Sequence, residues 1–91
     1  MKNTGAAADT PGSKASVDFW NRFVALPSTA DVKEMSPREA DEVLSELGRA
    51  MMESCARGGC DDVGELLVAM PKQNLKECGK LLLELALTRA K

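Results

Sequence analysis

The fold is decided by positions 36–59, which read SPREADEVLSELGRAMMESCARGG. The first four of these residues match a capping box, because Ser36 and Glu39 can exchange side-chain-to-backbone hydrogen bonds that satisfy the first turn of a helix. Pro37 suits the first helical position, and the two glycines at the end of the stretch favour a left-handed stop. We therefore predict one long helix over residues 37–57.

The apolar residues of this helix recur at helical spacing. At about 100° per residue they form one stripe roughly 140° wide, with polar residues around the rest of the circumference. The stripe consists of Ala40, Val43, Leu44, Leu47, Ala50, Met51 and Cys55. This pattern predicts that one side of the helix is buried against neighbouring helices.

The sequence on the N-terminal side predicts a shorter helix over Val17–Leu26. Ser16 is its expected N-cap, and Pro27 is expected to end it. The connector at 27–35 predicts a single helical turn after Ser28, with its apolar residues packed under the turn. The short connection favours an antiparallel arrangement of the flanking helices.

Two further helices are predicted on the C-terminal side. A short one covers Asp62–Met70, with Asp61 or Asp62 as its N-cap, and a longer one covers Asn74–Arg89, with Asn74 as its N-cap. The main apolar stripe expected in the longer helix consists of Leu75, Cys78, Leu82, Leu85 and Ala86. Its expected polar side consists of Lys76, Glu77, Lys80, Glu84 and Thr88.

The composition favours the same fold class. The chain of 91 residues contains 11 Leu, 12 Ala and five Met but no Ile and no Tyr. Leu, Ala and Met are strong helix formers, whereas β-branched and aromatic residues favour strands. Residues 1–15 hold no large apolar side chain after Met1, which predicts a disordered tail. We predict an all-α bundle of about four helices over residues 16–91. The absence of Ile is typical of a GC-rich bacterial genome.

The charge is nearly balanced overall but uneven along the chain. The net charge is −2, whereas a nucleic-acid-binding surface normally requires a basic excess. Residues 36–70 carry a net charge of −5, and residues 71–91 carry a net charge of +3. This asymmetry could orient a partner or pair two copies of the chain. The alternative is that both regions are ordinary solvated helix faces.

The expected compartment is the cytoplasm. No run of 18 apolar residues is present, and the polar N-terminus does not read as a secretory signal. We therefore expect no association with a membrane. Three cysteines are an awkward number for a disulfide framework and fit a reducing environment.

The sequence offers little support for a metal or catalytic centre. It has no His and no Tyr, which removes two common proton carriers and the commonest zinc ligand. The spacing of Cys55, Cys60 and Cys78 does not match a zinc knuckle, so we expect no metal, no cofactor and no enzymatic activity. A disulfide between Cys55 and Cys60 stays an open alternative, and small core filler is the expected role of Cys55 and Cys78.

The wide apolar arc of the last helix is the most informative feature for function. Beyond the main stripe, the arc is extended to about 240° of the circumference, which exceeds what one neighbour can cover, by Leu81, Leu83, Leu87 and Ala90. One interpretation places this helix at the centre of the core. The other leaves a face for a partner or for a second copy in a homodimer, with these three leucines as contact residues.

Two other groups are candidate protein-binding residues. All three aromatic residues fall within one short helix, Phe19, Trp20 and Phe23, and resemble in spacing the anchors that an amphipathic helix places in a groove. Their alternative role is packing within the chain's own core. Met52 lies off the stripe of the long helix, where it is either an adaptable contact or a lone exposed residue.

These features lead to a hypothesis about function. We expect a non-enzymatic regulatory protein that binds and inhibits or sequesters another protein, such as an anti-activator of a bacterial transcription factor or an adaptor. One alternative is an assembly subunit of a larger complex. A DNA-binding regulator is the other alternative, but the lysines of the last helix lack interleaved aromatic residues.

Overall fold

A computed structural model describes residues 11–91, apart from the side chains of Pro11 and Gly12, and confirms the predicted all-α fold. Residues 1–10, most of the predicted tail, lie outside the described residues. Every regular element between residues 11 and 91 is a helix. The helices are α2 (Pro11–Phe23), α3 (Thr29–Lys33), α4 (Pro37–Gly58), α5 (Val63–Ala69) and α6 (Lys72–Arg89).

Helix α4 begins and ends as its sequence predicts. The hydroxyl of Ser36 accepts a hydrogen bond from the backbone N–H of Glu39 at 3.2 Å, and the Glu39 carboxylate accepts one from the backbone N–H of Ser36 at 3.0 Å. Gly59 ends the helix in the left-handed region with φ of 77°. A second capping box, formed by Ser28 and Asp31, starts the single turn of α3. Local hydrogen bonding thus sets these three boundaries.

The cap of α4 carries a testable prediction. Replacing Ser36 by Ala is expected to lower the free energy of unfolding by about 1 kcal/mol, because the Glu39 N–H loses its acceptor. The backbone N–H of Ser36, and to a smaller extent its hydroxyl, hold the pKa of Glu39 below its ordinary value of 4.5. Because the substitution removes the hydroxyl but keeps the backbone N–H, it is expected to move this pKa only part of the way back toward 4.5, as measured by NMR titration of the carboxyl group.

The matched control for this cap is Ser45→Ala, an exposed serine inside the same helix. Its stability is expected to equal or slightly exceed that of the natural protein, because Ala is the better helix former. In the natural protein the contribution of the Glu39 carboxylate to folding stability is present above pH 4.5 and is lost as the pH falls through its lowered pKa. Equal urea midpoints for the two variants would contradict the assigned role of the cap.

Helix α2 begins earlier than the predicted Val17–Leu26, which corrects the boundary of the expected tail, and it ends at Phe23 rather than just before Pro27. It begins at Pro11, so residues 11–15 are helical, and the side chain of Ala15 is fully buried. Ser16 is not an N-cap but an internal residue whose hydroxyl donates to the carbonyl of Ser13 at 2.9 Å. The extension packs on α4, where a Cβ added to Gly58 would lie 2.7 Å from the backbone nitrogen of Ala15. A tertiary contact therefore stabilises this end of the helix.

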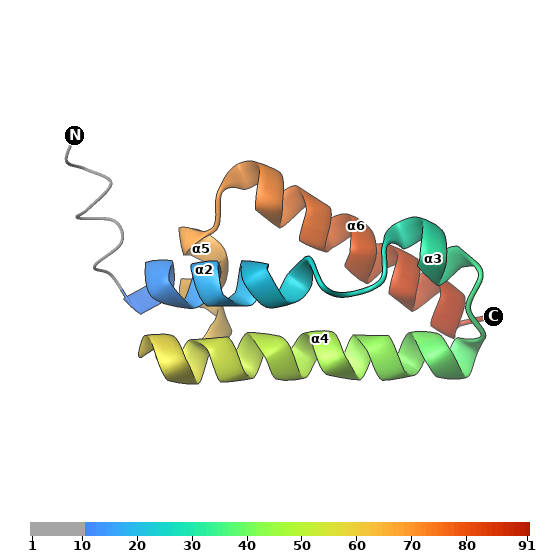
Figure 1. Cartoon of the computed structure of the whole chain (residues 1–91), viewed down its shortest axis with the longest axis horizontal. Coiled ribbons are helices and arrows are strands. Elements are labelled where there is room, and N and C mark those ends of the chain that lie inside the picture. The colour runs from blue at the N-terminus through green and yellow to red at the C-terminus, as the bar shows by residue number, and fades with distance from the viewer. Residues whose placement is uncertain (1–10) are drawn as a thin grey trace.

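The helices form an elongated bundle on α4, with dimensions of 46 × 23 × 18 Å (Figure 1). Helix α2 runs antiparallel to α4 along its C-terminal half, and α5 closes the same end of the bundle. Helix α6 descends toward the other end, where its last turns meet both α3 and the start of α4. The N-terminal end of α6 therefore lies on the opposite side of α2 from α4 in this view.

One core runs through the five helices of residues 11–91. Its largest fully buried apolar side chains are Phe19 of α2, Val32 of α3, Leu47 of α4, Leu66 of α5 and Leu85 of α6. The predicted stripe of α4 faces this core, with Ala40, Leu47, Ala50 and Cys55 buried and the other three members partly buried. Burial of a side chain such as Leu contributes roughly 1.5–3 kcal/mol, so these contacts dominate the stability of the bundle.

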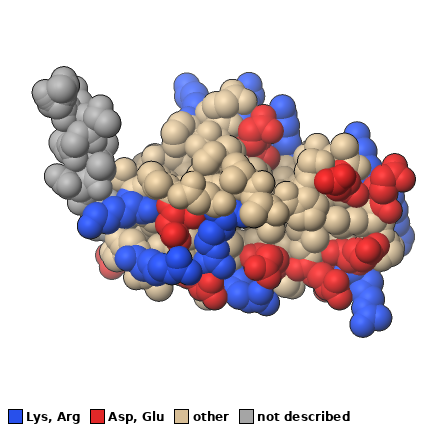
Figure 2. All heavy atoms as spheres, in the orientation of Figure 1, with Lys and Arg blue, Asp and Glu red and all other residues tan. Residues whose placement is uncertain are grey.

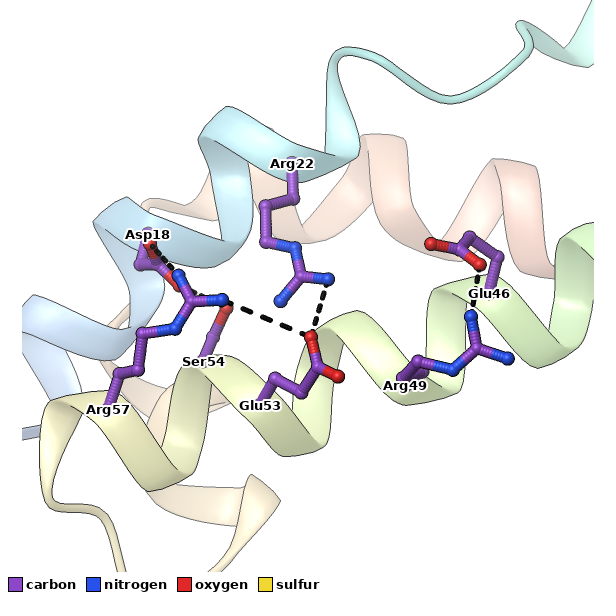
Figure 3. A network of polar contacts seen from close by, with 7 residues as sticks. All are labelled: Asp18, Arg22, Glu46, Arg49, Glu53, Ser54 and Arg57. Atoms are coloured by element: carbon purple, nitrogen blue, oxygen red, sulfur yellow. Dashed lines mark hydrogen bonds and ion pairs between the residues drawn. The ribbon is translucent and has the colours of Figure 1, made fainter.

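Polar contacts join α2 to α4 at the edge of this core (Figure 3). Asp18 accepts a hydrogen bond from the Ser54 hydroxyl at 2.7 Å and pairs with Arg57 at 3.2 Å. One turn along, Arg22 pairs with Glu53 at 2.7 Å. Because Ser54 is fully buried, its hydrogen bond to Asp18 fixes the register of the two helices as well as satisfying a polar group.

Candidate protein-interaction surface

Helix α6 has one buried face, and it differs in part from the expected stripe. The buried residues are Cys78, Leu81, Leu85 and Thr88. Leu75, Leu82 and Ala86, which we expected in the core, are exposed instead. Thr88, expected on the polar side, is fully buried. The apolar arc is so wide that the sequence allows several faces to be buried, and tertiary contacts select among them.

The contacts that select this face come from α3 and the start of α4. The Thr88 hydroxyl donates a hydrogen bond to the carbonyl of Val32 at 3.4 Å, a long contact. Beside it, Arg89 donates from Nε to Asp41 Oδ1 at 2.6 Å. The other end of α6 starts at Lys72, with Pro71 as N-cap, so Asn74 is not the cap that we predicted. The rotation of α6 is therefore fixed at its C-terminal end.

Helix α6 carries, on the side away from the core, a group of leucines that residues 11–91 leave partly or mostly exposed. Leu75 and Leu82 are 41% and 45% exposed, and Leu83 and Leu87 are 61% and 57% exposed. Ala86 lies among them and is exposed as well. Single exposed leucines are common on protein surfaces, but a contiguous group on one helix face marks an interaction site more often. We call these five residues the α6 outer face.

Cations flank the α6 outer face at its N-terminal end. Lys72 and Lys76 are exposed, and neither forms an ion pair within residues 11–91. Lys80 lies one turn further along and pairs with Glu77 at 3.5 Å. In Figure 2 basic side chains stand along the upper edge of the molecule, over α6, while acidic side chains gather over α3 and the start of α4. The uneven charge of the sequence is thus also uneven in space.

The three aromatic residues form one cluster at the C-terminal end of α2. Phe19 is fully buried, whereas Trp20 and Phe23 are partly buried and stack with their ring centroids 4.9 Å apart. Trp20 and Phe23 line a groove of about 320 Å³ together with Leu81 and Glu77 of α6. The cluster therefore packs within the chain, as the alternative interpretation had it, but its outer edge stays open to solvent.

The structure brings only some of the candidate binding residues together. Leu83 and Leu87 lie on the α6 outer face. Phe19 and Leu81 are core residues in this fold, because their side chains are at most 3% exposed, so a partner cannot reach them. Met52 is 68% exposed and belongs to α4, not to α6. Leu75 and Leu82 join the surface without having been singled out, because their spacing equally suits a core stripe.

The three cysteines are free thiols, and the pKa values of Cys60 and Cys78 are raised. Burial, with a smaller contribution from the Glu77 carboxylate, raises the pKa of Cys78 to about 11. Desolvation, followed by the nearby Cys55 and by acidic neighbours, raises the pKa of Cys60. Both thiols are therefore protonated at neutral pH, and a protonated thiol is a poor nucleophile.

Metal ligands, membrane-spanning helices and similarity to known proteins also bear on the class of site. Residues 11–91 contain no group of three or more Cys, Asp, Glu or His side chains arranged to hold a metal ion. None of the helices in this part of the chain combines the length and the apolar character needed to cross a membrane. No known protein family, no curated protein and no solved structure matches the sequence or the fold. The candidate site is the α6 outer face, because its exposed leucines lie together on one side of the helix.

Proposed function

We propose that this chain is a small non-enzymatic regulatory protein of the cytoplasm that binds another protein through the α6 outer face and thereby inhibits or sequesters it. The observation that carries the proposal is the group of four leucines on one side of α6, each between 41% and 61% exposed. Covering a leucine releases roughly 1.5–3 kcal/mol when burial is complete. A partner that covered all four would therefore gain much of its affinity there.

The chemistry of the remaining surface supports a binding role. The thiols of Cys60 and Cys78 are protonated at neutral pH, and the chain supplies no histidine to activate them. The groove beside Trp20 carries one carboxylate, Glu77, which already pairs with Lys80 and accepts a hydrogen bond from Gln73 at 3.2 Å. These groups do not form a pair of acid and base of the kind that catalysis uses.

The proposal predicts that charge on the α6 outer face abolishes binding. The double substitution Leu83→Glu and Leu87→Glu is expected to keep the fold, because both side chains are more than half exposed and Glu is a good helix former. Placing carboxylates where a partner buries apolar surface is expected to remove the partner entirely. The measurement is affinity capture from the cell of origin, with quantitative mass spectrometry, using the natural protein and the double variant.

The matched control for this experiment is Val17→Glu. Val17 is 61% exposed, the same fraction as Leu83, but it lies on α2. This variant is expected to capture the same partner as the natural protein, and circular dichroism checks that all variants are folded. A partner that binds the double variant as well as the natural protein would refute the proposal. A fixed stoichiometry with several subunits of one complex would instead favour the role of an assembly subunit.

A further inference from the structure

The charges around the α6 outer face point to the chemistry of its partner, an inference that rests on the proposed function. At about 100° per residue, Lys72 and Lys76 fall on the same side of α6 as Leu83 and Leu87. The acidic residues of α6, Glu77 and Glu84, lie more than about 100° from the centre of the leucine group. This side of α6 thus carries the leucines along most of its length and two lysines at its N-terminal end, and it is free of acidic residues.

The cationic flank is also where the surface is hollowed. A shallow depression of about 370 Å³ is lined by Lys72, Gln73, Leu75 and Lys76. It places the apolar side chain of Leu75 next to two ammonium groups that have no ion-pair partner within residues 11–91. A partner that presents an apolar side chain next to a carboxylate would contact Leu75 with the first and pair with the lysines through the second.

A second copy of the chain fits these features less well. If two α6 helices paired in antiparallel fashion about a twofold axis, Lys72 and Lys76 would face the end of the partner helix that carries Leu83, Leu87 and Ala90. That end of α6 itself offers no carboxylate, since Glu84 lies on another side of the helix, and the nearby Asp41 of α4 already pairs with Arg89. The leucines would be covered, but the lysines would meet no carboxylate on the α6 helix of the second copy. The acidic side of α4 offers carboxylates but no group of exposed leucines.

The first ten residues of the chain are also poorly suited to cover the α6 outer face. They read MKNTGAAADT, and Met1 is their only large apolar side chain. Four leucines require several apolar side chains at helical spacing to cover them. This segment lacks them.

We propose that the α6 outer face binds an amphipathic helix of another protein, whose apolar stripe meets the leucines and whose flanking carboxylates face Lys72 and Lys76. Two helices that pack in this way bury one stripe each, with charged side chains at the edges of the contact setting orientation and partner choice. The cationic flank selects an acidic partner helix over a basic one, because like charges across an interface are repulsive.

The test uses a displayed library of 18-residue amphipathic helices. Leucines are fixed along one stripe, and the flanking positions vary among Glu, Lys, Gln and Ser. Selection on the natural protein is expected to enrich Glu along one flank. A selected helix, synthesised as a peptide, is expected to bind Lys72→Glu/Lys76→Glu at least about tenfold more weakly by calorimetry, an effect of the size that two close charge pairs produce. Its affinity for Leu83→Glu/Leu87→Glu is expected to be lost.

The matched control reverses two exposed lysines elsewhere, Lys14→Glu and Lys33→Glu, and so changes the net charge equally. It is expected to bind the peptide like the natural protein. Enrichment of Lys or of uncharged flanks, an absence of binders, or an unchanged affinity for Lys72→Glu/Lys76→Glu would each overturn the inference. So would sedimentation showing a dimer that Leu83→Glu/Leu87→Glu dissociates, because a second copy would then cover the leucines. The proposed function fails separately, if this double variant still captures the cellular partner.

Discussion

Replacing Phe19 by Ala is expected to remove most of the net stability of the domain. The side chain is fully buried and lies 5.9 Å from the ring of Phe23, centroid to centroid, at the centre of the contacts between α2 and the rest of the core. Truncating a buried Phe costs about 3–5 kcal/mol. A core of this size supplies a net stability of about 3–5 kcal/mol, so the variant is expected to be largely unfolded at 25 °C.

The measurement for Phe19→Ala is urea denaturation followed by circular dichroism. Val17→Ala is the control, because Val17 lies two residues earlier on the same helix and is mostly exposed. Its free energy of unfolding is expected to change by less than about 0.5 kcal/mol. If Phe19→Ala unfolded at the same urea concentration as the natural protein, the packing of α2 described above would be incorrect.

The second large effect is expected from Gly58→Ala at the crossing of α2 and α4. A Cβ at this position would lie 2.7 Å from the backbone nitrogen and 2.8 Å from the Cβ of Ala15. Both are rigid parts of α2, so the helices must separate, and overpacking of this kind costs about 1–3 kcal/mol. We expect this loss of stability together with weaker hydrogen-exchange protection in the first turns of α2.

Gly48→Ala provides a control with the opposite expected sign. Gly48 lies in the interior of the same helix, and a Cβ added there meets nothing within 4 Å. The substitution is expected to raise the free energy of unfolding by up to about 1 kcal/mol, because Ala has the higher helix propensity. Thermal unfolding of the two variants, measured together, checks both signs. A stabilised Gly58→Ala protein would show that α2 does not approach α4 at Ala15.

The helix boundaries predicted correctly are those set by local chemistry. Ser36 and Glu39 lie within one turn, and their reciprocal hydrogen bonds need no other part of the chain. The same holds for Asp62, whose carboxylate accepts a hydrogen bond from the Glu65 N–H at 3.1 Å and starts α5. The single stripe of α4 also predicted its buried side, because only one rotation of that helix hides its apolar residues.

The features that were predicted incorrectly depend on distant contacts. Residues 11–15 have no apolar stripe of their own, and Ala15 is buried only because Gly58 leaves room for the close approach of α4. Thr88 reads as polar, yet the carbonyl of Val32 offers its hydroxyl a buried acceptor. Spacing alone could not identify the α6 outer face, because leucines occupy both sides of that helix. The contacts of α3 and α4 decide which leucines remain outside.

The fluorescence of Trp20 reports on the contact between α2 and α6. It is the only tryptophan of the chain, and its indole stacks on Phe23 at the edge of the groove beside Leu81. A ligand seated on the outer side of α6 leaves the surroundings of the indole, and therefore its emission maximum, unchanged. A ligand that separates α6 from α2 exposes the indole to water and shifts its emission to longer wavelength. One spectrum, recorded without any attached dye, distinguishes docking from remodelling.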